Sequence, residues 1–558
     1  MILQNFLKIR KYFFLEHYLV FLFFAFYFFI GLNIYRDYGI SIDEPFHRSV
    51  GYFWYIWINE NLFNNFQLSE LKNKFITMEW SRSLVSGKFH QYAAFFDIIA
   101  AFLEEKFKIT NTADAYYQKH LLNFCVFFIS SFFFFLLVKE KFKNSILAVI
   151  ATCIYISSPR IFAESFYNNK DIIFMAISVL VIYFTLKSFK EPSYTNTIIL
   201  VFLCAVATQI RILGIFFFIL YIFFFIISSL EEKKYFNKNI KFLLLFFFSY
   251  IFLNYTFWPY LWNNPINNFY FSLKTFSHFT LRGYADLLFM GKYISINNLP
   301  WSYIPIWIIA TTPIIYLFFF FISFVKTIFF FIQNFLNIEK NNGRKIWYSI
   351  NQKQDLYLLF CFLGPIFIVI ALNAILYNGW RHLYFVYPSM IYFVVLGIKE
   401  LIDFKKKIIK YIAYSLVVSA ILFNVNNIVK YHPYQNVYFN FFFEKKANDL
   451  FEIDYWGLGN LEVLKHVLKY ENKNKKVNIR TASFTPLNYS KFLLTKEEAD
   501  RIISTGTVDE EQEYIFTNYN YERNPKFTKK YKINDEYSDI FTLKRGYIVI
   551  NKMYKKNK

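Results

Sequence analysis

The chain has 558 residues, 56% of them hydrophobic, and a formal net charge of +22. Its mean hydropathy of +0.29 comes from apolar residues gathered in runs, which excludes a soluble enzyme and indicates an integral membrane protein. Lys and Arg lie mostly in short loops between these runs and in the carboxyl tail, so the charge reflects membrane topology and does not point to a nucleic-acid partner.

The first apolar run, near 18–34, is predicted to be a retained membrane span, because no small-residue cleavage site follows it. A span needs about 20 apolar residues, and the later candidates bring the expected total to about eleven. They lie near 120–138, 144–158, 172–187, 196–212, 214–230, 242–257, 303–325, 355–376, 383–398 and 409–427. Counting 196–230 as two crossings keeps the basic loops on one side, which predicts a cytoplasmic amino terminus and an external tail.

Three long segments are then predicted to face outward: 35–119, 258–302 and the tail 430–558. The first contains an amphipathic stretch, Phe89 to Phe102, which is typical of helices that lie along a membrane surface. We therefore expect interfacial helices in this segment and no further crossing.

The tail lacks apolar runs, and its pattern predicts a small α/β domain with a helix over Asn460 to Tyr470. Short strands are expected at Lys476 to Thr481, Glu513 to Thr517 and Gly546 to Asn551. The predicted fold class is an all-α polytopic membrane module over 1–429, followed by an extracytoplasmic α/β domain over 430–558.

Two adjacent carboxylates, Asp43 and Glu44, stand at the outer mouth of the first span. Carboxylates there suit a transferase that works on a membrane-dissolved substrate, because an acceptor hydroxyl must lose its proton as it attacks an anomeric carbon. In the structural alternative, Ser41 caps a helix and the two acids only favour its positive amino end. The residues alone leave both interpretations open.

The second outward loop, Ser158 to Asp171, is short and dense in ionisable groups, which a link that only turned the chain would not need. Lys170 can hold a phosphate as a point charge. The alternative is that Lys170 extends to the membrane surface while Asp171 caps the next span.

Charged residues also lie at the ends of later apolar segments: Arg211 near one, Arg381 and His382 just before another. Charges at membrane depth are costly and mark functional sites. A polyprenyl phosphate donor needs fixed cations for its leaving group, and Arg offers a bidentate fork, although both arginines could instead extend to the interface. His120 opens the second span and could orient a catalytic neighbour or serve the structure alone.

Three pieces of the sequence together resemble the family 39 branch of the GT-C glycosyltransferases, which contains protein mannosyltransferases and bacterial aminoarabinose transferases. They are the Asp43-Glu44 pair, the loop from Pro159 to Asp171, and Trp380-Arg381-His382. Further fragments resemble a bacterial subgroup: Trp258 to Trp262 with Asn264-Pro265, Leu299 to Tyr303, and His432 to Asn440.

The resemblance implies a membrane transferase that takes a hexose or pentose from a polyprenyl phosphate on the outer face. In that case Asp43 is the catalytic carboxylate and Glu44 its helper, while Lys170, Arg211 and Arg381 face the lipid phosphate. The acceptor could be a lipid, a glycan or a protein, and the expected location is a bacterial cell membrane.

The competing prediction is a transporter or flippase for a lipid-linked glycan, which should carry charges along a path through several helices. Here the ionisable groups gather at the predicted outer ends. No cofactor is required by the pattern, but two carboxylates beside a phosphate can hold Mg²⁺ or Mn²⁺. The four cysteines lie in apolar segments without CxxC spacing and predict no zinc site.

Overall fold

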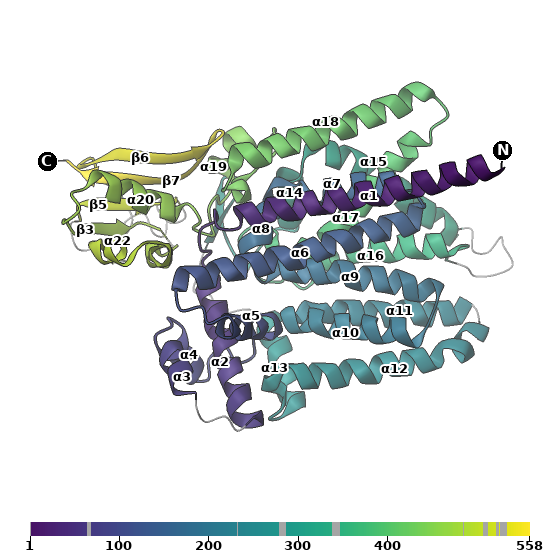
Figure 1. Ribbon diagram of the computed structural model, residues 1–558, viewed down its shortest axis with the longest axis horizontal. Coiled ribbons are helices and arrows are strands. Elements are labelled where there is room, and N and C mark those ends of the chain that lie inside the picture. Colours follow the sequence, from purple (N-terminus) through teal and green to yellow (C-terminus); the bar gives the residue numbers. More distant parts are fainter. Residues whose placement is uncertain are drawn as a thin grey trace.

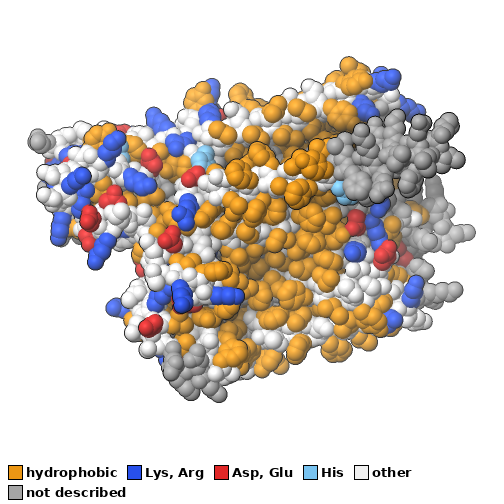
Figure 2. All heavy atoms as spheres, viewed as in Figure 1, with side chains coloured by type: hydrophobic (Ala, Val, Ile, Leu, Met, Phe, Trp, Pro, Cys, Tyr) orange, Lys and Arg blue, Asp and Glu red, His pale blue; other side chains and the backbone are white. Residues whose placement is uncertain are grey.

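The computed structural model describes residues 2–63, 68–231, 233–277, 286–336, 346–483, 485–505, 512–519, 524 and 533–557. Long helices lie side by side along the longest axis of the molecule (Figure 1), with a small sheet next to the carboxyl terminus at one end and the amino terminus at the other. In Figure 2 hydrophobic side chains cover the middle of the molecule, whereas charged side chains gather toward its two ends. This is the distribution expected of a protein that crosses a bilayer.

Nine helices in the described part of the chain are long and apolar enough to cross a membrane. They include α1 (Ile2–Ile34), α6 (Thr112–Phe142), α9 (Asp171–Lys190), α11 (Ile215–Glu231), α12 (Lys233–Phe257), α15 (Ile314–Leu336), α16 (Ile350–Ala371), α17 (Tyr387–Ile402, after the 3-10 turn η4, Arg381–Val386) and α18 (Lys407–Tyr431). Two helices, α7 (Ser145–Ile156) and α8 (Pro159–Tyr167), form a pair bent by 71°, and α10 (Tyr194–Ile210) is a shorter apolar helix. The expected total of eleven requires that the bent pair and α10 both cross.

Two predicted segments have a different local structure. The apolar run 303–325 is broken at Pro313 into α14 (Tyr303–Thr311) and α15, because a proline cannot continue the hydrogen-bonding of the preceding helix. The predicted loop from Ser158 to Asp171 contains the buried helix α8, which begins at Pro159. Proline is favoured in a first helical turn, where its missing N–H is not needed.

Several helices begin at a polar cap whose side-chain oxygen accepts a backbone N–H two or three residues later. Asn111 accepts from Ala113 at 2.8 Å before α6, and Asn144 accepts from Leu147 at 2.9 Å before α7. Lys143, which links these two helices, has a φ of 54°, in the left-handed region that often ends a helix. Asn111 therefore marks the start of α6, and Lys143 and Asn144 mark the point where α6 ends and α7 begins.

The segment between α1 and α6 folds into four short helices at the end of the molecule that carries the sheet (Figure 1). They are α2 (Glu44–Leu62), α3 (Ser69–Ile76), α4 (Ser81–Val85) and α5 (Phe95–Lys106). A separate apolar cluster that includes Val50, Leu71 and Ala101 holds them together. The helix expected over 89–102 is present as α5, shifted toward the carboxyl end.

The segment after α12 lies at this same end. It contains α13 (Pro265–Ser277) and a hairpin of β1 (Asp286–Phe289) and β2 (Lys292–Ser295). Phe289 forms an isolated antiparallel bridge with Phe451 of the tail. The three segments predicted to face one side of the membrane therefore gather at one end of the molecule.

The tail forms the predicted α/β unit, in which α20 (Asn460–Tyr470) has the expected bounds. Its five-stranded sheet has the order β4-β3-β5-β7-β6, with β3 parallel to β4 and β5, and β7 antiparallel to β5 and β6. The strands are β3 (Val477–Thr481), β4 (Ile502–Thr505), β5 (Tyr514–Thr517), β6 (Tyr537–Arg545) and β7 (Ile548–Lys556), with α21 (Leu487–Ser490) and α22 (Lys496–Arg501) between β3 and β4. The predicted fold class, a helical membrane protein with a small carboxyl-terminal α/β domain, is confirmed, and α18 extends past residue 429, where the membrane module was expected to end, to Tyr431.

The close contact between α15 and α17 depends on Gly397. A Cβ atom at this position would lie 2.1 Å from the carbonyl oxygen of Phe319, so we expect Gly397→Ala to destabilise the protein by about 1–3 kcal/mol through overpacking. Thermal unfolding of the purified protein checks this. The matched control is Gly364→Ala, whose Cβ would lie 3.2 Å from a ring atom of Phe216; an equal shift in the two variants would contradict the prediction.

Candidate active site

Asp43 lies where the chain leaves α1 and enters α2. It is the N-cap residue of α2, but its side chain makes no capping hydrogen bond. Instead its Oδ2 accepts a hydrogen bond from Nη1 of Arg381 at 2.6 Å. The Asp43 side chain is 35% exposed and that of Arg381 is 5% exposed. The carboxylate is therefore oriented by a buried cation while part of it remains accessible.

The guanidinium of Arg381 lies between two carboxylates. Its Nη1 is also 3.4 Å from Oδ2 of Asp171, whose side chain is fully buried. Trp456 and Tyr377 lie against this guanidinium, with their ring centres 4.6 and 5.1 Å from its central carbon. Two aromatic faces and two acids fix the Arg381 side chain in place.

Arg211 completes an alternating row of charges. It follows the last residue of α10, and its Nη2 donates to the second oxygen of Asp171. The Arg211 side chain is 20% exposed. We call Asp43, Arg381, Asp171 and Arg211 the charge row; its inner members are buried and its outer members reach accessible space.

Asn168 orients Asp171. Its Oδ1 accepts the backbone N–H of Asp171 at 2.9 Å, and its Nδ2 donates to Asp171 Oδ2 at 3.2 Å and to Glu164 Oε2 at 2.8 Å. Asp171 is also the first residue of α9. The negative charge of Asp171 is therefore stabilised by the positive amino end of α9, and the same carboxylate binds Arg211 and Arg381. Its predicted role at the helix start is thus compatible with a role in a functional site.

Lys170, next to Asp171, extends toward the first outward segment. Its Nζ donates to the carbonyl oxygen of Ala93 at 3.1 Å and lies 5.5 Å from the ring centre of Tyr92. Burial lowers the pKa of Lys170 to about 8, with a further contribution from Arg211, although Asp97 and Asp171 oppose the shift. Lys170 is therefore near the charge row but is not part of it.

A second buried cluster, which the sequence analysis did not predict, surrounds Asp97 of α5. His47 Nδ1 lies 3.1 Å from Asp97 Oδ2, Lys119 Nζ lies 3.3 Å from Oδ1, and Asn169 donates to Oδ1 at 3.1 Å. Burial opposes ionisation of this acid, but Lys119 and His47 outweigh it and hold the pKa of Asp97 well below its usual value. The sequence did offer one signal for this cluster, because Asp97 is an acid within the amphipathic stretch from Phe89 to Phe102.

Glu44 and His120 form a pair beside Asp43. Glu44 Oε2 accepts the backbone N–H of Ser41 at 2.6 Å, and its Oε1 lies 2.9 Å from His120 Nε2. His120 Nδ1 in turn lies 3.1 Å from the carbonyl oxygen of Tyr35. Both side chains are fully buried, so this pair holds the turn that carries Asp43.

The tail contributes directly to the site through Trp456. Its carbonyl oxygen accepts the backbone N–H of Ile42 at 3.0 Å. Asp454 accepts the N–H groups of Gly457 and Gly459 at 3.1 and 2.9 Å, which fixes the turn before α20. The tail thus places an aromatic face on Arg381, beside the first outward segment.

His382 follows Arg381 in the 3-10 turn η4. The His382 ring packs edge-on against Tyr377 at 4.5 Å between ring centres, and Tyr377 in turn lies against the Arg381 guanidinium. No group of three or more His, Cys, Asp or Glu side chains that could hold a metal ion occurs in the part of the chain that the structure describes. Between Asp43 and Asp171, the position that a cation would take is that of the Arg381 guanidinium.

Known proteins provide an independent comparison. Residues 117–258 match the family model described as dolichyl-phosphate-mannose-protein mannosyltransferase, a segment that contains His120, Asp171 and Arg211. Structures of ArnT from Cupriavidus metallidurans, apo and bound to undecaprenyl phosphate, are each 8% identical, with TM-scores of 0.45 and 0.42, and the alignments cover 96% of this chain and 97% of theirs. No curated protein matches. Over residues 117–258 the chain is therefore similar to the family of dolichyl-phosphate-mannose-protein mannosyltransferases, which agrees with the resemblance seen in the sequence.

Proposed function

We propose that this membrane glycosyltransferase moves one sugar from a polyprenyl-phosphate donor to an acceptor on the extracytoplasmic face, with Asp43 as the base. The observation that carries the proposal is the charge row. The half-buried carboxylate of Asp43 lies 2.6 Å from the buried Arg381, and the buried Asp171 binds both Arg381 and Arg211. A base and two cations at one place suit the departure of a phosphate from a sugar.

The proposed reaction is a displacement at the anomeric carbon. The acceptor oxygen forms the new bond while its proton passes to the Asp43 carboxylate. The bond between the anomeric carbon and the phosphate oxygen breaks, and its electron pair stays on the departing polyprenyl phosphate. Arg381 and Arg211 would stabilise the charge that develops there, and the part-exposed Arg211 is placed to present N–H groups to it.

Asp171 and Glu44 act in this proposal as positioning residues. Asp171 is fully buried and binds both arginines, which fixes their separation. Glu44 holds Ser41 and His120, which fixes the turn from which Asp43 extends. Neither needs to touch the substrate.

Lys170 is proposed to be a further contact for the donor phosphate. Because its pKa is lowered to about 8, the ammonium is charged below pH 8 and loses its proton above it. Transfer should therefore decline as the pH rises through about 8, and Lys170→Arg should remove that decline by keeping the charge. Rates measured from pH 6 to 10 check this; identical profiles for the two proteins would exclude the role of Lys170.

We propose that Arg381 and Arg211 serve in place of the divalent cation that the sequence pattern also allows. The basis is the position of the Arg381 guanidinium between Asp43 and Asp171. Transfer should then persist in EDTA. Loss of transfer in EDTA, with recovery on adding Mg²⁺ or Mn²⁺, would instead assign a cation to Asp43 and the donor phosphate.

The alternative of a flippase for a lipid-linked glycan is less well supported, because the charge row lies where the first outward segment meets α9, α10 and η4, not along a path between the two ends. Mass spectrometry of lipid-linked and surface glycans tests the choice in cells with the wild-type chain, Asp43→Asn or no copy. A single missing sugar in both altered strains supports transfer. Intact product with Asp43→Asn, but glycan-lipid accumulating on the inner face when the gene is absent, would support transport.

A further inference from the structure

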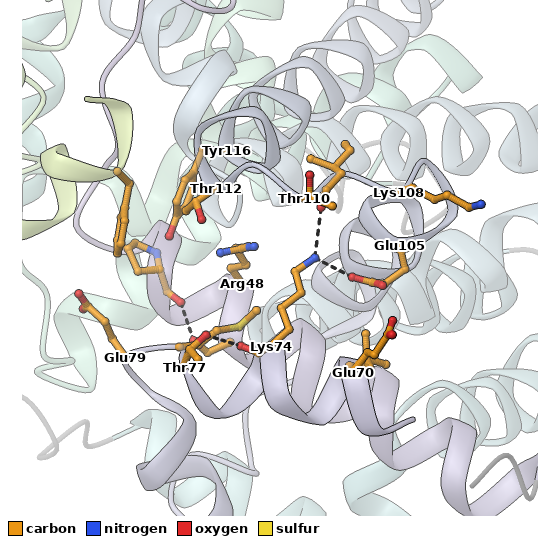
Figure 3. A pocket seen from close by; sticks show the side chains of 16 residues that line it. Arg48, Glu70, Lys74, Thr77, Glu79, Glu105, Lys108, Thr110, Thr112 and Tyr116 are labelled. Atoms are coloured by element: carbon orange, nitrogen blue, oxygen red, sulfur yellow. Dashed lines mark hydrogen bonds and ion pairs between the residues drawn. The ribbon is translucent and has the colours of Figure 1, made fainter. Parts of the chain in front are cut away.

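A cavity of about 820 Å³ lies among the helices of the segment 35–119 and the start of α6. It opens to the surface and is lined by residues of α2, α3, the end of α5 and the start of α6, together with Phe492 of the tail. Figure 3 shows Lys74 reaching from α3 toward Glu105, with Arg48, Thr112 and Tyr116 around the same space. Binding sites for small molecules commonly have volumes of about 300–1,000 Å³, so this cavity could hold a ligand of considerable size.

The cavity is next to the proposed base. Pro45, which lines it, is two residues after Asp43. Tyr489, in α21 of the tail, lies between the two places: its ring centre is 6.5 Å from that of Phe492, which lines the cavity, and it shares an apolar cluster with Ile42, the residue before Asp43. A ligand that fills the cavity and continues past Tyr489 would therefore reach the turn that carries Asp43.

The charges that line the cavity are largely balanced within the protein. Arg48 Nη2 lies 2.6 Å from Glu104 Oε1, and Lys74 Nζ lies 2.8 Å from the same oxygen. Lys74 is also 2.7 Å from Glu105. The lining as a whole contains three cations, Arg48, Lys74 and Lys108, and three acids, Glu70, Glu79 and Glu105, so it has no excess of positive charge for a polyanionic ligand.

Hydroxyl groups and aromatic rings make up another part of the lining. Thr110 and Thr112 supply hydroxyls that can donate and accept hydrogen bonds, and the Thr77 hydroxyl, which donates to the Lys74 carbonyl oxygen at 2.7 Å, can still accept one. Tyr116 and Phe492 stack with their ring centres 5.9 Å apart and an interplanar angle of 23°. This aromatic pair next to the threonine hydroxyls gives the lining both apolar and hydrogen-bonding surface, which complements a sugar with its C–H faces and hydroxyls.

We propose that this cavity binds a neutral oligosaccharide, and that this saccharide is the part of the acceptor next to the hydroxyl that Asp43 deprotonates. The inference rests on the proposed function and narrows the acceptor to a glycan, either free or attached to a lipid.

Saturation-transfer NMR on the full-length protein in nanodiscs tests the proposal. The probes are maltotetraose, mannotetraose, chitotetraose and the glycan released by mild acid from cells that lack the gene, with a tetraglycine peptide for comparison. We expect saturation of at least one saccharide and none of the peptide. Phe492→Ala and the nearly isosteric Glu79→Gln should each weaken binding about tenfold, whereas Tyr470→Ala, at an exposed aromatic elsewhere in the tail, should not.

The possible results test the saccharide-binding cavity and the proposed transferase activity separately. Absence of saccharide binding, or binding that survives both cavity variants, would overturn the proposed site even if the protein turns over its donor. Saccharide binding that is lost in both variants, in a protein without donor turnover, would support the site and overturn the transferase. The lipid-attached form of the glycan is then compared with the released form: tighter binding of the attached form would identify a glycolipid.

Discussion

Replacing Asp43 with Asn is expected to lower the rate of sugar transfer by about 10²–10⁴-fold, the usual contribution of a general base. The amide keeps the shape of the side chain and an oxygen that can accept from Arg381, but it cannot take up the acceptor proton. Turnover of a polyprenyl-phosphate sugar by the purified protein measures the effect. Because donor contacts are assigned to the cations, the donor KM should change much less than kcat.

Asp37→Asn is the matched control for this experiment. Asp37 is another acid in the segment that follows α1; it is 47% exposed, and its Oδ2 lies 2.8 Å from His432 Nε2. Its loss should leave transfer within about twofold, since exposed pairs contribute little. Equal effects of Asp37→Asn and Asp43→Asn, or an Asp43→Asn protein that keeps most of its activity, would contradict the assignment of Asp43.

Changes at Arg381 are expected to have the second large effect. Arg381→Lys keeps a positive charge but loses the planar guanidinium, whose Nη1 contacts both Asp43 and Asp171 and whose remaining N–H groups an ammonium cannot replace. We expect transfer to fall by about 10²–10³-fold, as on removal of one transition-state donor. Arg381→Ala should also destabilise the protein by about 3–5 kcal/mol, because it removes a partner of the buried Asp171. Kinetics and thermal unfolding measure the two effects separately.

A double variant separates catalysis from stability at this site. Asp171→Asn combined with Arg381→Ala removes the buried negative charge together with its partner, so it should regain much of the stability but none of the activity. As a control, Arg36→Ala breaks an exposed pair with Asp114, 3.8 Å long, and should cost at most about 1 kcal/mol. Recovery of transfer in the double variant would mean that Arg381 acts only on folding.

The membrane helices could be predicted because their signal is local. A run of apolar residues that crosses a bilayer has to be helical, and each predicted span has a helix in the structure. The run 303–325 was predicted as one helix but forms two, because Pro313 lies inside it. The strand β6 was missed because it lies largely exposed and carries polar residues such as Asp539 and Lys544. Its register is set by pairing with β7.

The candidate site could be predicted only in part, because its geometry joins distant segments. The sequence indicated which charged residues lie near the ends of apolar runs, but not that Asp43 pairs with Arg381 or that Asp171 binds two arginines. Trp456 packs on Arg381 from the tail, and no local pattern specifies such a contact. The roles of these residues stay predictions until variants are measured.

The contrast between Glu44 and Asp43 illustrates the same limit. Adjacent acids are equivalent in sequence, yet Glu44 is buried against His120 while Asp43 is 35% exposed beside Arg381. Burial and partners therefore assign one acid to the structure and leave the other available for chemistry.

Donor turnover by the purified chain is the most direct test of the central claim. The protein is reconstituted in liposomes with undecaprenyl-phosphate sugars and the glycan from cells that lack the gene, and the release of undecaprenyl phosphate is followed together with the glycosylated product. The account predicts one undecaprenyl phosphate released per sugar transferred by the wild type, and neither product with Asp43→Asn. Movement of the lipid-linked sugar between leaflets, with no undecaprenyl phosphate released, would contradict it.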